Sequence, residues 1–149
     1  MSRRQRSRAQ PADGRAGGSA PLVLLVDDFV DNREMYALYL AYVGFRVSEA
    51  SNGAEALAKA FEERPDVIVM DLSLPVMDGW EATRRLKADD RTRTVPVIAL
   101  TSHALEGFSK GAWEAGCDAF VTKPCLPEQL AAEIRKVLGE RPAPASRRP

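Results

Sequence analysis

The chain has 149 residues, of which 45% are hydrophobic and 28% charged, and its formal net charge is zero. This length and composition predict one soluble globular domain. No apolar stretch approaches the roughly 18 residues of a membrane helix, and the two cysteines belong neither to a CxxC pair nor to a histidine-rich cluster. We therefore expect a reduced, cytoplasmic protein that has no membrane role.

The charges are unevenly distributed. Residues 1–20 contain five arginines and one acid, and residues 141–149 contain three arginines and no acid, so residues 21–140 carry seven net negative charges. Both ends lack large apolar residues, which predicts disordered tails around one folded domain at 21–140. An acidic body argues against a nucleic-acid-binding domain. The tails are either solubility or cloning remnants or an electrostatic tether to nucleic acid, membrane or an acidic partner.

The first half of the folded part alternates short apolar runs with amphipathic segments. Residues 22–26 form a continuous Val/Leu run, typical of a strand buried on both faces. A helix follows at 31–43 and ends at Gly44. Residues 45–50 form a weaker strand, and the next helix is capped by Ser51 or Asn52 and ended by Pro65. The apolar residues at helical spacing are Met35, Leu38, Tyr39 and Tyr42 in the first helix, and Ala54, Leu57, Ala58 and Phe61 in the second.

The second half repeats this alternation. Strands are expected at 67–70, 97–100 and 119–122, and helices at 80–87 and 105–115. The helix at 105–115 contains Gly107 and Gly111, so we expect it to be among the least stable elements. The last helix begins at Pro127, and its inward residues are Leu130, Ile134, Val137 and Leu138.

Five strands alternating with five helices predict an α/β fold, a doubly wound five-stranded parallel sheet of order 2-1-3-4-5, as in flavodoxin-like (βα)5 proteins. In such sheets ligands bind beyond the carboxyl ends of the strands, where the strand order reverses. Here that point lies between the first and third strands.

Polar residues follow four of the strands. Asp27 and Asp28 come after the first strand, Asp71 after the third, Thr101 after the fourth and Lys123 after the fifth. Three crowded carboxylates repel one another unless a cation binds them, and their oxygen atoms suit Mg²⁺, with Mn²⁺ able to substitute. We expect Asp28 and Asp71 to bind the metal directly and Asp27 through water. A loop carbonyl, that of Ser73, completes the set.

The remaining groups suit a phosphoryl ligand. Lys123 can pair with one phosphate oxygen and Thr101 can donate its hydroxyl to another. Carboxylates are known covalent phosphoryl acceptors, and Asp71 lies centrally among the other groups. The sequence therefore predicts phosphoryl transfer to Asp71, supported by a metal and Lys123.

These motifs, taken in order, resemble the receiver domains of bacterial two-component response regulators, including the single-domain chemotaxis type. The resemblance covers residues 21–139. It rests on the acidic pair in Val26-Asp27-Asp28, the acceptor in Val69-Met70-Asp71-Leu72 and the loop Leu74-Pro75-Val76-Met77-Asp78-Gly79. It continues with Ala99-Leu100-Thr101-Ser102 and Val121-Thr122-Lys123-Pro124.

The resemblance implies that a histidine kinase or histidine phosphotransfer protein donates a phosphoryl group to Asp71. The domain catalyses this transfer and the later hydrolysis but is otherwise not an enzyme. It further implies a switch that couples Thr101 to Phe120, a cis bond at Lys123–Pro124, and an influence of His103 on the phosphoryl lifetime.

A downstream protein target is expected on the face formed by residues 105–115, the fifth strand and the last helix, where Phe108 and Trp113 are candidate contacts. Three alternatives stay open. An aspartyl-phosphate phosphatase needs a second acid two residues beyond Asp71, where Ser73 stands. A receiver-like partner-binding domain would act without phosphorylation, and a nucleic-acid binder would act through the tails.

Overall fold

The computed structural model describes residues 20–72, 76–101 and 113–139, without the side chains of residues 76–78. Apart from Ala20, the expected tails at 1–20 and 141–149 lie outside these ranges, and so does most of the helix expected at 105–115. Ser73, His103, Gly107, Phe108 and Gly111 also lie outside them.

The sheet has five parallel strands. They are β1 (Leu22–Val26), β2 (Arg46–Ala50), β3 (Val67–Asp71), β4 (Val97–Thr101) and β5 (Ala119–Thr122). Their order is β2-β1-β3-β4-β5, which confirms the predicted topology. Every residue of β3 and β4 is buried, because helices cover both faces of the sheet and leave these central strands no solvent side.

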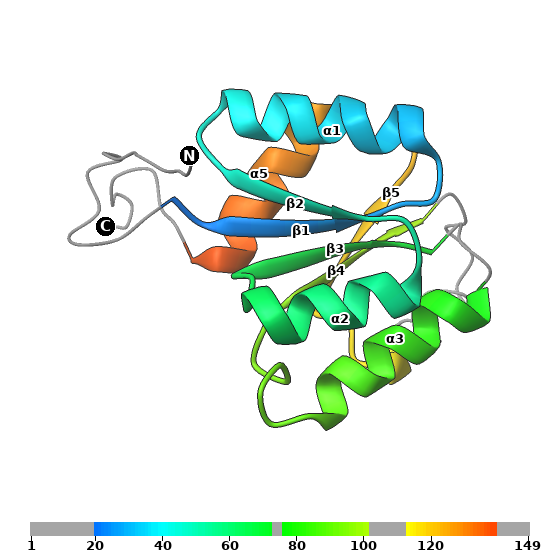
Figure 1. Ribbon diagram of the computed structural model, residues 1–149. Coiled ribbons are helices and arrows are strands. Elements are labelled where there is room, and N and C mark those ends of the chain that lie inside the picture. The colour runs from blue at the N-terminus through cyan, green and yellow to red at the C-terminus, as the bar shows by residue number, and fades with distance from the viewer. Residues whose placement is uncertain (1–19, 73–75, 102–112, 140–149) are drawn as a thin grey trace.

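Two layers of helices enclose the sheet. The described helices are α1 (Val30–Tyr42), α2 (Gly53–Glu63), α3 (Val76–Ala88) and α5 (Pro127–Leu138), and residues 113–115 are also helical. Figure 1 shows α1 and α5 on one face of the sheet and α2 and α3 on the other. Helix α3 begins one turn before the expected residue 80. Within the described ranges, no helix combines the length and apolarity needed to cross a membrane.

The core is divided by the sheet. Alternate strand residues point to opposite faces, so Leu24, Ile68 and Met70 pack toward α2 and α3. Their neighbours Val23 and Val69 belong to the cluster beneath α1 and α5. This packing anchors the carboxyl ends of the central strands β1, β3 and β4 from both sides and holds the residues that follow in place.

The sheet-facing side of α1 differs from the expectation. Met35, Leu38 and Tyr42 are 45%, 76% and 84% exposed, whereas the buried residues of this helix are Tyr36 and Leu40. The predicted apolar face was wrong because it omitted Tyr36. That side chain can be buried because its hydroxyl donates a hydrogen bond to the Cys125 carbonyl at 2.7 Å.

Helix α2 departs in the same way. It buries the small residues Gly53, Ala56 and Ala60, whereas Ala54 and Ala58 are exposed and Leu57 and Phe61 half-buried. The expected face was therefore wrong here as well. Small side chains let α2 lie close to the sheet and to α3, so Gly53, Ala56 and Ala60 take the central positions.

Candidate functional site

The candidate site lies at the carboxyl edge of the sheet. Asp27 directly follows β1, Asp71 is the last residue of β3, Thr101 is the last of β4, and Lys123 directly follows β5. Because the strands are parallel, these four ends meet at one edge, which lies to the right in Figure 1. The strand order reverses there, between β1 and β3.

Asp71 and Lys123 form a close ion pair. The Lys123 ammonium Nζ lies 2.7 Å from Asp71 Oδ2. The Asp71 side chain is 1% exposed and that of Lys123 is 17% exposed. Beside this pair, the Lys123 amide donates a hydrogen bond to the Thr101 carbonyl at 2.7 Å, and Thr101 is fully buried. The structure thus brings together Asp71, Thr101 and Lys123, which the sequence placed at three separate strand ends.

Asp27 is held by hydrogen bonds at its backbone and at one side-chain oxygen. Its amide donates to the Ala50 carbonyl at 3.0 Å, and its Oδ1 accepts from the Phe29 amide at 2.9 Å. The other oxygen, Oδ2, is buried and has no hydrogen-bond partner among the described residues. A buried carboxylate oxygen without a partner is unfavourable unless a proton or a cation binds it.

The electrostatics of Asp27 agree with this geometry. Burial raises the pKa of Asp27 from its ordinary 3.8 to about 6, and the neighbouring Asp71 carboxylate adds to the increase. The hydrogen bond from the Phe29 amide and the Lys123 charge act in the opposite direction and lower the pKa. Asp27 therefore retains a proton to a higher pH than an exposed aspartate does.

The acid set fits a divalent cation in part. Asp27 and Asp71 are buried beside each other, whereas Asp28 is exposed. In the ranges that the structure describes, no group of three or more His, Cys, Asp or Glu side chains is arranged to hold a metal ion. Mg²⁺ needs only one or two carboxylates, because water and phosphate oxygens complete its shell. The unpartnered Oδ2 of Asp27 beside Asp71 meets that need.

Arginine 33 was not identified from the sequence as part of the site. Its guanidinium Nη1 donates to the Asp27 carbonyl at 2.8 Å, and its Nε donates to Glu49 Oε1 at 3.0 Å. The only sequence signal is an arginine near the start of the helix that follows the acidic pair. Its partner Glu49 is on another strand and could not be inferred.

Two aromatic residues lie on the β5 side of the site. Trp113 is 52% exposed, and its ring stacks on that of Phe120, with centroids 5.7 Å apart and planes at 23°. Phe120 belongs to β5, where it pairs with Ala99 of β4, two residues before Thr101. About half of the Trp113 side chain is therefore accessible to a partner. The Lys123–Pro124 bond is cis, as the resemblance implied.

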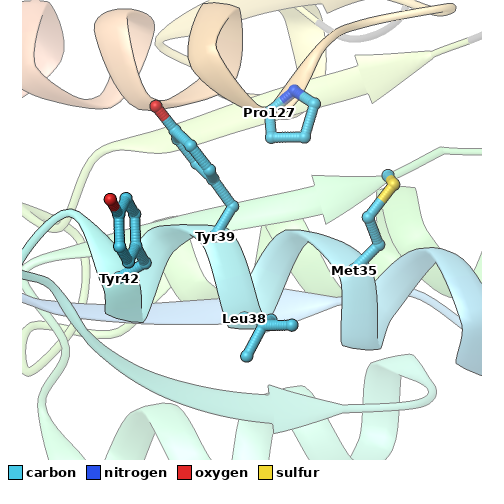
Figure 2. Close-up of a pocket in the computed structure, with 5 residues that line it drawn as sticks. All are labelled: Met35, Leu38, Tyr39, Tyr42 and Pro127. Atoms are coloured by element: carbon cyan, nitrogen blue, oxygen red, sulfur yellow. The ribbon is translucent and has the colours of Figure 1, made fainter.

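An apolar groove lies on the face of the sheet that α1 and α5 cover. Figure 2 shows its lining side chains on α1 and at the start of α5. The groove has a volume of about 550 Å³. Its lining consists of Met35, Leu38, Tyr39, Tyr42 and Pro127. Phe29 and Leu126, the residues just before α1 and α5, are 55% and 61% exposed and lie in the segments that lead from Asp27 and Lys123 into these helices. Exposed apolar surface of this kind is typical of a protein contact.

Comparison with known proteins points to one family. Residues 23–135 match the model of the response regulator receiver domain. The polar-differentiation response regulator DivK of Brucella anthropi is 36% identical over 118 residues, which cover 79% of this chain and 96% of DivK.

Two solved structures are similar in fold and sequence. The chemotaxis protein CheY4 of Vibrio cholerae has a TM-score of 0.76 and 32% identity, and the match covers 80% of this chain and 99% of CheY4. The receiver domain of the sensor histidine kinase PA1611 from Pseudomonas aeruginosa has a TM-score of 0.75 and 34% identity over 82% of this chain and all of that domain. That structure holds a magnesium ion in its active-site cleft.

Proposed function

The chain belongs to the response regulator receiver domain family, and from this premise we propose that it accepts a phosphoryl group on Asp71 from a histidine kinase or a histidine phosphotransfer protein. Receiver domains of two-component systems are phospho-acceptor switches that bind Mg²⁺, rather than classical enzymes. The observation that carries the proposal is the buried Asp71 carboxylate, 2.7 Å from the Lys123 ammonium and beside the unpartnered oxygen of Asp27.

The proposed transfer uses groups already at the sheet edge. A carboxylate oxygen of Asp71 attacks the phosphorus of the phosphohistidine, and an oxygen–phosphorus bond forms as the phosphorus–nitrogen bond breaks. The electron pair leaves with the imidazole, which takes a proton. The Lys123 ammonium binds a phosphoryl oxygen and stabilises the negative charge on it, and the Thr101 hydroxyl donates a hydrogen bond to another. Later hydrolysis of the acyl phosphate returns Asp71 to its free state.

The proposed cation set is Asp27, Asp28, Asp71 and the Ser73 carbonyl, with Mn²⁺ able to replace Mg²⁺. When bound, the cation neutralises charge on the acids and on the phosphoryl oxygens. Asp27 Oδ2 supports this assignment, since it is buried beside Asp71 and has no partner in the described part of the chain. Asp28 is exposed, so its carboxylate is accessible to water and to a cation.

We expect the wild-type protein to gain one phosphoryl group when it is incubated with acetyl phosphate and Mg²⁺. Chelation with EDTA removes the cation that offsets the repulsion between the carboxylates, so labelling is expected to fall to background. Intact-mass spectrometry measures the result. Absence of labelling with the cation present would favour a partner-binding domain that acts without phosphorylation. Turnover of a phosphate monoester would favour a phosphatase.

We further propose that phosphorylation acts on Phe120 and on the face around β5 and α5, where a downstream protein binds in the cytoplasm. The Thr101 hydroxyl moves toward the phosphoryl group and Phe120 turns inward. Because Trp113 stacks on Phe120 at 5.7 Å, movement of Phe120 changes the surroundings of an exposed indole. The expected roles of Phe108 in partner contact and of His103 in phosphoryl lifetime stay predictions.

Tryptophan fluorescence is expected to report this switch. Phosphorylation with acetyl phosphate should change the emission of the wild-type protein, because the ring stacked on Trp113 changes position. The change is expected to persist in Trp80→Phe and to disappear in Trp113→Phe. If Trp113→Phe retains the full signal, Trp113 does not follow the switch.

The phosphodonor is proposed to bind the apolar groove between α1 and α5. The helices that line this groove, α1 and α5, begin just after the turns that carry Asp27 and Lys123, where Phe29 and Leu126 are exposed. A protein that presents a phosphohistidine to Asp71 must cover those turns and would bury the groove beside them. Apolar residues at one-turn intervals on α1 suit the side of a partner helix.

A charge placed in this groove is expected to slow phosphorylation by a protein donor but not phosphorylation by a small-molecule donor. Met35→Glu should slow transfer at least 10-fold from a kinase or phosphotransfer protein that phosphorylates the wild type, because it places a carboxylate in an apolar contact. Labelling by acetyl phosphate should be unchanged. Ala54→Glu, on the exposed side of α2, is the matched control. Equal slowing by both variants, or slowing with acetyl phosphate as well, would count against the groove.

A further inference from the structure

The turn after β1 is restrained by an arginine that the metal and phosphoryl chemistry does not require. We propose that Arg33 is a positioning residue that sets the cation affinity of the acidic site by holding Asp27 in place. The proposal rests on the proposed cation binding at Asp27 and Asp71. It concerns the backbone carbonyl of Asp27, which no proposed ligand uses.

Arg33 joins three elements. It is on α1, where its backbone amide donates to the Phe29 carbonyl at 3.0 Å. Its guanidinium reaches back to the Asp27 carbonyl after β1, at 2.8 Å, and across to Glu49 on β2, at 3.0 Å. The Arg33 side chain is only 17% exposed, so these bonds are largely shielded from water. A guanidinium can serve both partners at once because its donors diverge in a fixed plane.

Glu49 is itself anchored. Its backbone carbonyl accepts a hydrogen bond from the Lys59 ammonium of α2. The same ammonium, Nζ, lies 3.7 Å from Glu55 Oε2. Within the described ranges the Arg33 guanidinium therefore bonds to a carboxylate on the sheet at one end and to the Asp27 carbonyl at the other. Such an arrangement fixes the guanidinium in position rather than leaving it on a flexible stem.

Three of the four polar atoms of Asp27 have hydrogen-bond partners. The amide is bound to Ala50, the carbonyl to Arg33, and Oδ1 to the Phe29 amide. Only Oδ2 has no partner in the described part of the chain, and it is buried near Asp71. Two neighbouring carboxylates repel each other, so Asp27 would rotate toward water if its backbone were released. Arg33 opposes that movement and keeps Oδ2 available for a cation.

The charge of Arg33 has the opposite effect on a cation. A guanidinium near the acidic site repels Mg²⁺, and the paired Glu49 carboxylate offsets part of that repulsion. Removing the positive charge alone would therefore tighten cation binding. Removing a positioning contact would weaken it. The sign of the change in affinity distinguishes the two roles.

The test is a titration of ¹⁵N-labelled protein with MgCl₂, followed by ¹H–¹⁵N NMR. We expect Arg33→Gln to bind Mg²⁺ about 10-fold to 100-fold more weakly than wild type, as is common when a residue that orients a metal ligand is removed. The Phe29 amide, which bonds to Asp27 Oδ1, should shift and exchange faster with solvent. Arg33→Lys keeps the charge but cannot bond to the Asp27 carbonyl and Glu49 at once, so its Mg²⁺ affinity should lie between those of wild type and Arg33→Gln. Should Arg33→Gln fail to fold, Arg33→Lys, which keeps the charge, is measured in its place and is also expected to bind more weakly.

The matched control is Arg46→Gln. Arg46 also donates to a backbone carbonyl, that of Ala20, but at the opposite end of β2, so its loss should leave the affinity unchanged. Tighter binding by Arg33→Gln, or unchanged affinity with a lower melting temperature, would overturn the positioning role. A wild-type protein that binds no Mg²⁺ would instead overturn the proposed function.

Discussion

Replacing Lys123 by Met is expected to slow phosphorylation of Asp71 by acetyl phosphate about 100-fold, which is typical when one donor to a developing oxyanion is removed. The Lys123 ammonium is 2.7 Å from Asp71 Oδ2 and is the proposed partner of the phosphoryl oxygens. Met retains most of the apolar stem but no charge. The initial rate of phosphoryl incorporation, followed by intact mass with Mg²⁺ at saturation, measures the effect.

The same substitution is expected to lower the free energy of unfolding by about 2 kcal/mol, because the buried Asp71 carboxylate loses a charged hydrogen-bond donor. Lys136→Met, at an exposed position on α5, is the control and should change neither quantity. A Lys123→Met protein that is destabilised but phosphorylated at the wild-type rate would remove Lys123 from the chemistry. It would leave Lys123 only a structural role.

Replacing Asp27 by Asn is expected to change stability and phosphorylation in opposite directions. The pKa of Asp27 is raised from 3.8 to about 6 in the folded protein, so the folded state binds this proton more tightly than the unfolded state. Protonation of Asp27 therefore stabilises the folded state. This stabilisation is fully present below about pH 4 and is lost as the pH rises through about 6. Above pH 6 the carboxylate is ionised and destabilises the metal-free fold.

Asn keeps the shape of the side chain without its charge. At pH 8 without divalent cation, Asp27→Asn should be more stable than wild type by about 3 kcal/mol, and near pH 4 the two should be about equally stable. Labelling by acetyl phosphate should fall about 10-fold to 100-fold, because a proposed cation ligand is lost. Urea unfolding at both pH values measures the stability difference.

Addition of Mg²⁺ provides the companion measurement. The cation should raise the melting temperature of wild type far more than that of Asp27→Asn, since a ligand stabilises the fold only where it binds. Asp90→Asn, at an exposed position, serves as the control. If Asp27→Asn were less stable than wild type at pH 8, burial of Asp27 beside the Asp71 carboxylate would not be what makes its ionised form unfavourable.

The strands and the residues at their ends could be predicted from local patterns. Buried strands such as Val67–Asp71 begin with an unbroken apolar run, here residues 67–70, and parallel strands bring their carboxyl ends to one edge whatever the rest of the chain does. That rule alone placed Asp71 near Lys123, which is 52 residues away in the chain. The rule depends only on strand order and direction.

The side chains of the helices could not be predicted in this way. Burial of Tyr36 depends on the carbonyl of Cys125, which is 89 residues further along the chain. The role of Arg33, on α1, likewise depends on Glu49, which belongs to β2. Neither contact leaves a periodic signal in the sequence. Such contacts decide which side of α1 faces the sheet and how the Asp27 backbone is held.

Asp71, and no other carboxylate of the chain, is proposed to form the acyl phosphate. The most direct test is to phosphorylate wild type and Asp71→Asn with acetyl phosphate and Mg²⁺, trap the product by borohydride reduction, and sequence the modified peptide by mass spectrometry. We predict modification at residue 71 of the wild type and none in Asp71→Asn. Modification at Asp27 or Asp28 in the wild type, or equal labelling of the variant, would contradict it.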